Sequence, residues 1–155
     1  MPIYRSKAPL RIGLAGGGTD VSPYCDLYGG AILNASISLS AYANIEITND
    51  QRITVSAMDR NESASFDWAP TLPITGELDL LKGVYNRVSR EFGVPQTGFH
   101  LSTYVDAPAG SGLGTSSTLV VAILGAFAEW LRLPLGDYDF AHMAYEIERQ
   151  ELQLA

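Results

Sequence analysis

The chain has 155 residues, a formal net charge of −7 and 46% hydrophobic residues. This length fits one ordinary domain, and this composition is typical of a globular fold and excludes a disordered chain. The net negative charge argues against broad binding to nucleic acid or anionic membranes, because both partners require a basic face. The single cysteine, Cys25, excludes an internal disulfide and a thiolate zinc cluster. With no signal-peptide pattern and no apolar run long enough for a bilayer, we expect a cytoplasmic protein.

The first predicted element is a short strand over Leu10–Leu14, which ends at the sequence Ala-Gly-Gly-Gly-Thr-Asp of residues 15–20. Arg11 on this strand carries a planar fork of donors that suits phosphoryl oxygens. Asp20 can accept hydrogen bonds from sugar hydroxyls, and Gly16–Gly18 leave room for a substrate against bare backbone. Simpler interpretations stay open: an ion-pair partner for Arg11, a turn cap for Asp20 and a hairpin for the glycines.

The middle of the chain predicts further strands. Alternating residues indicate strands over Ala31–Ile37 and Ala41–Thr48, followed by a hairpin turn at Asn49-Asp50. The strand Arg52–Ala57 is then expected to pair back on its predecessor. Residues 59–77 lack periodicity and contain prolines, which predicts a surface loop.

The second half alternates between helix and strand. A helix is predicted over Asp79–Phe92, with Gly93 as its stop. A strand over Gly98–Val105 follows, and then a helix over residues 116–131 that is apolar on nearly all sides and therefore buried. A last amphipathic helix begins at Asp137. Strands mixed with helices in this order indicate an α+β layered fold.

The most informative segment runs from Asp106 to Ser117, between the last strand and the buried helix. Gly110, Gly112 and Gly114 let the backbone approach a ligand closely. Thr115–Ser117 are predicted to cap the helix, whose first N–H groups have no intrahelical partner. Together with the helix dipole these donors predict an anion site, with the phosphate chain of a nucleotide as the expected anion.

Two common nucleotide motifs do not fit this loop. A Walker A loop requires a lysine where Thr115 stands, and the dinucleotide fingerprint requires a glycine at the same position. A plain tight turn with a helix cap remains the alternative interpretation.

Taken together, the two segments resemble the first two motifs of the GHMP kinase superfamily of galactokinase, homoserine kinase, mevalonate kinase and phosphomevalonate kinase. Residues 9–20 match the pattern Pro-x-Arg-hydrophobic-x-Leu-x-Gly-x-x-Thr-Asp, and residues 108–116 match Pro-x-x-x-Gly-Leu-Gly/Ser-Ser/Thr-Ser. The resemblance implies the GHMP kinase N-terminal ATP-binding domain over residues 1–155, an α+β fold like domain 2 of ribosomal protein S5. Within the superfamily, residues 15–24 most resemble the D-glycero-D-manno-heptose 7-phosphate kinases, with fucokinase-like proteins next.

The resemblance also implies roles for particular residues. It implies a catalytic role near the reacting oxygen for Arg11, and Mg²⁺ coordination by Ser116 and Glu148, whose alternative is a solvated helix acid. The implied sugar-binding residues are Arg11, Gly16, Gly17, Gly18, Thr19 and Asp20. The implied contacts to ATP come from Pro108, Gly110, Ser111, Gly112, Leu113, Gly114, Thr115, Ser116 and Ser117.

Two other residues have open alternatives. Lys7 is either a ligand for a substrate phosphate or a surface lysine at a strand edge. Trp68 either stacks on adenine or packs locally.

The resemblance also implies a catalytic Asp, about a dozen residues after the metal-binding Glu in GHMP kinases of this type. Counted from Glu148, its position falls beyond Ala155. The C-terminal domain is absent from this chain as well, and the last helix reaches Ala155 without a capping residue. We therefore expect the N-terminal part of a sugar kinase, inactive alone, whose boundary arises from truncation or cleavage. The expected cofactors are ATP and Mg²⁺.

The expected reaction phosphorylates the anomeric hydroxyl of D-glycero-D-manno-heptose 7-phosphate to the 1,7-bisphosphate. A fucokinase-like or other sugar kinase is one alternative, and a noncatalytic nucleotide- or sugar-binding fragment is another. The net charge opposes an S5-like nucleic-acid module. The expected partners are the sugar phosphate, ATP, the complementary C-terminal half and a second copy in a homodimer, with no nucleic acid and no membrane.

Overall fold

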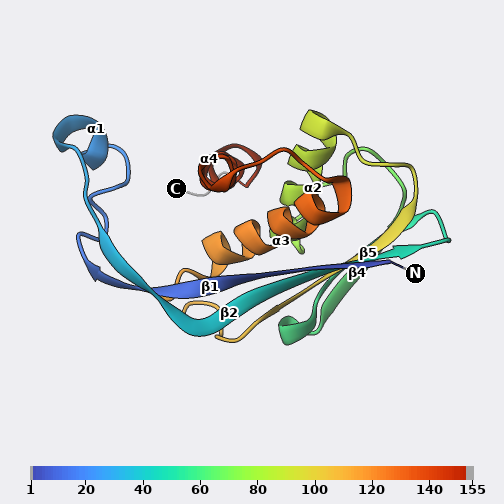
Figure 1. Ribbon diagram of the computed structural model, residues 1–155, viewed down its shortest axis with the longest axis horizontal. Coiled ribbons are helices and arrows are strands. Elements are labelled where there is room, and N and C mark those ends of the chain that lie inside the picture. Colours follow the sequence, from blue (N-terminus) through green and yellow to red (C-terminus); the bar gives the residue numbers. More distant parts are fainter. Residues whose placement is uncertain (1, 153–155) are drawn as a thin grey trace.

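A five-stranded sheet in the order β1-β2-β5-β3-β4 carries the long helices on one face (Figure 1). The structure, a computed structural model, describes residues 2–152. The strands are β1 (Ile3–Ala15), β2 (Leu33–Thr48), β3 (Arg52–Ala57), β4 (Glu62–Asp67) and β5 (Gly98–Val105). The helices are α1 (Tyr24–Tyr28), α2 (Asp79–Phe92), α3 (Thr115–Leu131) and α4 (Asp137–Glu146), with a 3-10 turn η1 (Met58–Arg60) and a π-helical turn η2 (Ile147–Glu151). The expected α+β layered fold is confirmed.

The central strand of the sheet is β5, and this corrects one prediction. β3 does not pair back on β2, because β5 lies between them, antiparallel to β2 and parallel to β3. In this position Leu101 stands between Ile45 and Val55, in register with both. The insertion of β5 therefore completes an apolar row across the buried face of the sheet.

Three strand boundaries also differ from the prediction. β1 begins at Ile3 instead of Leu10, and β2 is one continuous strand instead of two, with a register shift between Pro9 and Arg11 of its partner. The segment predicted as a loop contains β4. This edge strand points only Ala64 and Phe66 towards the core, so its hydrophobic pattern is too weak to read from the sequence.

The three predicted helices are present, with one error in their capping, whereas the short helix α1 was not predicted. α2 has the predicted bounds and ends at Gly93, where φ is 76°. α3 starts one residue early, and its N-cap is Gly114 with no side-chain cap. The expected hydroxyl caps at Thr115–Ser117 are therefore wrong: these residues occupy the first turn. The predicted uncapped end at Ala155 lies outside the described residues.

The chain leaves α4 through a π turn, in which the N–H of Leu152 donates to the carbonyl of Ile147 at 3.1 Å.

None of the helices within residues 2–152 combines the length and the apolar character that crossing a bilayer requires.

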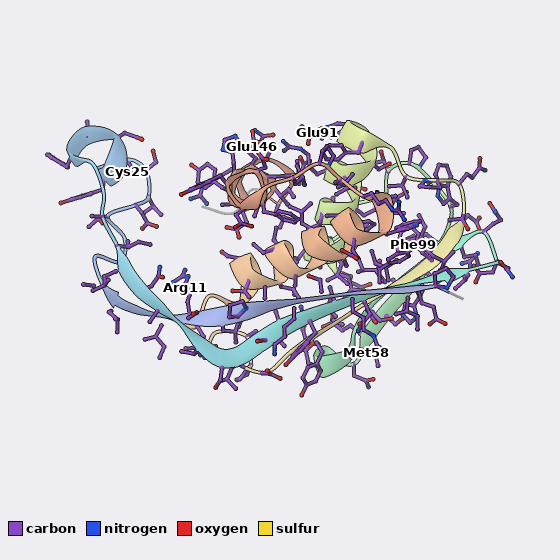
Figure 2. All side chains as sticks on the ribbon, in the orientation of Figure 1. Arg11, Cys25, Met58, Glu91, Phe99 and Glu146 are labelled. Atoms are coloured by element: carbon purple, nitrogen blue, oxygen red, sulfur yellow. The ribbon has the colours of Figure 1, made fainter. Side chains whose placement is uncertain are left out.

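An aromatic cluster joins the sheet to two helices. The ring of Phe99 on β5 lies 5.5 Å from Tyr85 of α2, and 6.0 Å and 5.3 Å from Phe127 and Trp130 of α3. Figure 2 places Phe99 between the sheet and the helices. The cluster therefore fixes how α2 and α3 sit on the sheet.

The far ends of β1 and β2 leave the body of the domain as a two-stranded ribbon that carries α1 at its tip (Figure 1, left). Large apolar side chains are exposed there, including Leu27 at 71% and Tyr28 at 74%. An apolar surface of this kind is typical of a contact with another polypeptide segment.

Phe127→Ala should lower the free energy of unfolding by about 3–5 kcal/mol, because it removes a fully buried ring from this cluster. Urea unfolding followed by far-UV circular dichroism measures the loss. Tyr138→Ala is the control, since Tyr138 is 92% exposed and should change stability by less than about 0.5 kcal/mol. Equal losses in the two variants would contradict the packing role.

Candidate functional site

The glycine-rich loop is attached to the ribbon at both of its ends. The N–H of Arg11 on β1 donates to the carbonyl of Leu113 at 3.0 Å. At the start of the loop, the N–H of Asp106 donates to the carbonyl of Ser40, and the N–H of Ser40 donates to Asp106 Oδ2 at 2.9 Å. The two motifs recognised in the sequence are thus brought into direct contact.

The side chain of Arg11 lies against Gly114, at the point where α3 begins. A Cβ on Gly114 would stand 3.0 Å from Nε and 3.2 Å from Cγ of Arg11. The backbone of Gly114 also has a φ of 72°, which side-chain-bearing residues rarely adopt. The left-handed backbone favours glycine here, and the small residue leaves room for the Arg11 side chain next to the N-terminus of the helix.

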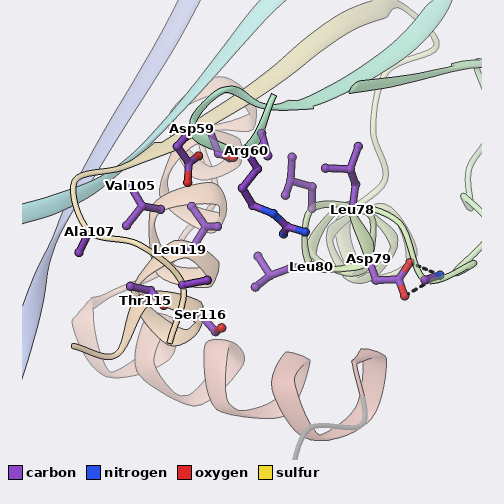
Figure 3. A pocket seen from close by; sticks show the side chains of 15 residues that line it. Asp59, Arg60, Leu78, Asp79, Leu80, Val105, Ala107, Thr115, Ser116 and Leu119 are labelled. Carbon is purple, nitrogen blue, oxygen red and sulfur yellow. Dashed lines mark hydrogen bonds between the residues drawn. The ribbon is translucent and has the colours of Figure 1, made fainter. Parts of the chain in front are cut away.

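A first cleft of about 260 Å³ opens beside this N-terminus (Figure 3). Thr115 and Ser116 of α3 lie on one side of it, and Asp59 and Arg60 of η1 lie on another. Apolar side chains line the space between them, namely those of Leu78, Leu80, Leu81, Val105 and Leu119. Backbone donors of a helix N-terminus next to an apolar chamber can hold a phosphorylated compound with a flat apolar part, as a nucleotide has.

The wall formed by residues 75–79 is held by a polar cluster. The carboxylate of Asp79 accepts hydrogen bonds from the N–H groups of Thr75 and Gly76 at 3.2 Å and 3.0 Å. Lys82, whose side chain is 1% exposed, lies 3.4 Å from Asp79 and donates to the Thr75 hydroxyl at 3.1 Å. These contacts tie the wall to the start of α2.

A second cleft, of about 350 Å³, lies on the other side of Arg11. It is lined by the predicted residues Arg11, Gly17, Gly18 and Asp20. Asn34 lines it too, from the position on β2 that pairs with Gly13. Sequence reasoning missed Asn34 because only the strand pairing places it beside the first motif.

The other two residues of the predicted sugar site hold the loop together. A Cβ on Gly16 would clash with the carbonyl of Ala31. The Thr19 hydroxyl lies 2.6 Å from the Gly16 carbonyl, to which it can donate, and it accepts from the N–H of Ala31 at 3.2 Å. Neither Gly16 nor Thr19 lines the second cleft. Their contacts instead close the loop that carries Asp20.

Glu148 differs from the acids around it. Within residues 2–152 no hydrogen bond or ion pair engages this half-buried carboxylate, whereas Glu146 and Glu151 both pair with Arg87. Burial alone would lower the pKa of Arg87, but its hydrogen bonds to Glu91 and Glu146 raise it. The acids on either side thus belong to an ion-pair network that Glu148, among the described residues, does not join.

The donor set suits Mg²⁺. α3, which carries Ser116, packs against both α4 and η2, which carries Glu148. The part of the chain that the structure describes contains no group of three or more His, Cys, Asp or Glu residues arranged for a metal. Mg²⁺ requires no such group when one hydroxyl, one carboxylate and phosphate oxygens surround it. Ser116 and Glu148 thus supply the types of oxygen ligand that Mg²⁺ takes, on elements that pack together, although Glu148 does not line the first cleft itself.

The remaining candidates lie away from both clefts. The Lys7 ammonium stands 5.8 Å from the ring centre of Tyr42 on the face of the sheet that the helices leave open, so a contact to the substrate phosphate is not supported. Trp68 packs against the core and does not line the first cleft, which favours local packing over adenine stacking.

Comparison with known proteins gives consistent results. Residues 79–153 match the family of GHMP kinases N terminal domains. Over 152 residues the chain is 48% identical to a D-glycero-alpha-D-manno-heptose 7-phosphate kinase from Campylobacter jejuni, which covers 98% of this chain and 45% of that protein.

Known structures agree with these sequence matches. The crystal structure of a D-glycero-D-manno-heptose 1-phosphate kinase from Bacteroides thetaiotaomicron is 58% identical with a TM-score of 0.93, over 99% of this chain and 50% of that one. Lactococcus lactis galactokinase complexed with galactose, at 20% identity and a TM-score of 0.81 over 99% of this chain and 39% of that one, shares the fold. The chain thus spans about half the length of its heptose kinase relatives.

The Thr19 contacts generate a local prediction. Thr19→Val removes the hydroxyl but keeps the shape of the side chain, so the Ala31 N–H loses its acceptor. The local opening free energy should fall by about 1–3 kcal/mol, which corresponds to amide exchange about fivefold to a hundredfold faster. Hydrogen exchange at Ala31 measures this change. Asp20→Asn, in the same loop, should leave the exchange rate as it is; an unchanged rate in Thr19→Val would refute the closing role.

Proposed function

Because this chain belongs to the GHMP kinase family, we propose that it forms the N-terminal part of an ATP- and Mg²⁺-dependent sugar kinase, with residues 1–155 as the nucleotide-binding domain. The observation that carries the proposal is the place of Arg11. Its N–H holds the glycine loop, its side chain lies against Gly114, and it lines the cleft that contains Asp20. Arg11 therefore stands between a site suited to phosphates and a site suited to a polyol.

In this proposal the two clefts divide the substrates. The nucleotide base enters the apolar first cleft, and the phosphate chain meets the glycine loop and the first turn of α3 from Pro108 to Ser117. Ser116 and Glu148 would hold Mg²⁺, and the chemistry supplied there is neutralisation of phosphate charge. The sugar occupies the second cleft, where Asp20 accepts from its hydroxyls and Gly17 and Gly18 leave the space free of side chains.

Arg11 would then donate to the phosphoryl oxygens during transfer. Catalysis of phosphoryl transfer depends on alignment of the acceptor and on stabilisation of the charge on the transferred group. A guanidinium whose stem is wedged against the helix N-terminus can do both without rearrangement. The catalytic carboxylate would come from the C-terminal half of the kinase.

As acceptor we propose the anomeric hydroxyl of D-glycero-D-manno-heptose 7-phosphate, which gives the 1,7-bisphosphate. Support comes from the two heptose kinases at 48% and 58% identity. Their names differ in the position of the phosphate: one is a heptose 7-phosphate kinase and the other a heptose 1-phosphate kinase. A fucose kinase has weaker support, since the Bacteroides fragilis L-fucokinase/L-fucose-1-P guanylyltransferase is 26% identical over 163 residues.

The C-terminal half is the partner that the proposal requires. Its contact surface would include the apolar ribbon around α1, where Leu14, Leu27 and Leu33 are exposed. A cytoplasmic location is part of the proposal and agrees with a single cysteine that keeps a free thiol. A noncatalytic nucleotide- or sugar-binding fragment is the competing function.

One experiment separates these functions. The chain is mixed with a second polypeptide, produced separately, that corresponds to the C-terminal half of the heptose kinase relatives. The chain alone should release no sugar-dependent ADP, and the mixture should do so with heptose 7-phosphate. Heptose 1-phosphate and fucose serve as the alternative acceptors in the same assay. Turnover with fucose alone would favour the second kinase, whereas binding of ATP without turnover in any mixture would favour a noncatalytic fragment.

Asp20→Asn should raise the KM for the sugar about tenfold to a hundredfold in the active mixture, because a charge-assisted hydrogen bond contributes about 1.5–3 kcal/mol. The KM for ATP should stay within about twofold, since Asp20 does not line the first cleft. Initial rates with each substrate varied in turn give both constants. A raised KM for ATP with an unchanged KM for sugar would reverse the assignment of the two clefts.

A further inference from the structure

One buried arginine ties together three segments that surround Glu148. Arg87 of α2 is 5% exposed and lies 2.8 Å from Glu146 at the end of α4 and 3.4 Å from Glu151 of η2. It also pairs with Glu91 on its own helix at 2.9 Å. Figure 2 shows Glu91 and Glu146 on the facing sides of α2 and α4. A single guanidinium thus joins α2, α4 and η2.

The π turn allows both Glu146 and Glu151 to reach Arg87. Residues five apart in an α-helix, such as Glu146 and Glu151, are separated by about 140° around the axis. In an i→i+5 turn they come to lie on the same side. The hydrogen bond from Leu152 to Ile147 is of this type. The ion pairs with Arg87 and the π turn therefore stabilise each other.

Glu148 lies inside this turn, bracketed by the two anchored acids. It takes no part in the contacts with Arg87, although the acids on both sides of it do. Arg87 shares Glu151 with Arg90, which lies 2.8 Å from it, but Arg87 alone of the two also reaches Glu146. The backbone is therefore anchored on both sides of Glu148, whose own carboxylate has no hydrogen bond or ion pair among the described residues.

We propose that Arg87 is a positioning residue for metal binding, which holds the π turn of residues 147–151 so that Glu148 is presented to a Mg²⁺–nucleotide complex. The inference rests on the proposed function. Arg87 lines neither cleft and touches neither substrate site. Arg87 does lie on α2, and Leu80 and Leu81 of the same helix line the first cleft, where the nucleotide base is proposed to bind. Through Arg87, α2 therefore connects this cleft to the segment that carries Glu148.

The test replaces Arg87 by lysine in this chain, because an ammonium cannot bridge several carboxylates as a guanidinium fork does. Hydrogen exchange should become faster at the amides of residues 147–151. Affinity for Mn²⁺, titrated by electron paramagnetic resonance in the presence of a non-hydrolysable ATP analogue, should fall about tenfold or more. In the mixture with the C-terminal half, the Mg²⁺ concentration for half-maximal rate should rise by the same factor.

Two controls separate positioning from general loss of stability. Val88→Ala destabilises α2 from a buried position without touching the network, so it should leave Mn²⁺ affinity unchanged. Glu146→Gln leaves Arg87 in place with its other partners, Glu91 and Glu151. If Arg87→Lys fails to fold, this variant replaces it, and it should lower the Mn²⁺ affinity by a smaller factor. An equal loss of affinity in Val88→Ala would overturn the inference.

A double-mutant comparison distinguishes the inference from the function on which it rests. If Arg87 acts through Glu148, then Arg87→Lys should cause no further loss of Mn²⁺ affinity in a Glu148→Gln background. Fully additive losses would overturn the positioning role, and so would a loss seen only in Glu148→Gln. Unchanged affinity in Glu148→Gln would instead overturn the metal role of Glu148, and the inference with it.

Discussion

The hydrogen bond from the Arg11 N–H to the Leu113 carbonyl, 3.0 Å long, is the contact on which the rest of the site depends. β1 is an edge strand, so its outer edge can bond to a loop instead of another strand. This bond joins the end of the glycine loop to β1, while the bonds between Asp106 and Ser40 join its start to β2. With these bonds, the position of α3 on the sheet also sets the distance between the two clefts.

Local charge arrangement explains how an acidic chain can hold phosphate. The net charge of −7 repels anions at long range, but the first turn of α3 contains no acidic residue. The acids nearest to Glu148 are neutralised by Arg87 and Arg90, which lies 2.8 Å from Glu151. Of the two acids that line the first cleft, Asp79 is paired with Lys82, so oriented donors and local ion pairs offset part of the negative charge at the site.

The sequence predicted what depends on local spacing. Glycines and hydroxyls at fixed intervals identified both motifs, and apolar periodicity gave α2 its exact bounds because neighbours along the helix determine them. Features set by distant neighbours were missed: the insertion of β5 beside β3, the edge strand β4, and Asn34, which joins the second cleft only through strand pairing. Capping was mistaken because hydroxyls favour the N-cap in general, whereas the N-cap here has a left-handed backbone, with φ of 72° at Gly114, which favours glycine.

The central place of β5 has a consequence for how the domain forms during synthesis. β1–β2 and β3–β4 are each two-stranded units, which are at most marginally stable alone. They become one sheet only when residues 98–105 lie between them, and the chain must close a long loop from β3 to β5 first. In a nascent chain that ends before β5, the edges of β2 and β3 that β5 will occupy are therefore unpaired. We expect cooperative folding of the sheet to begin only after β5 has left the ribosome.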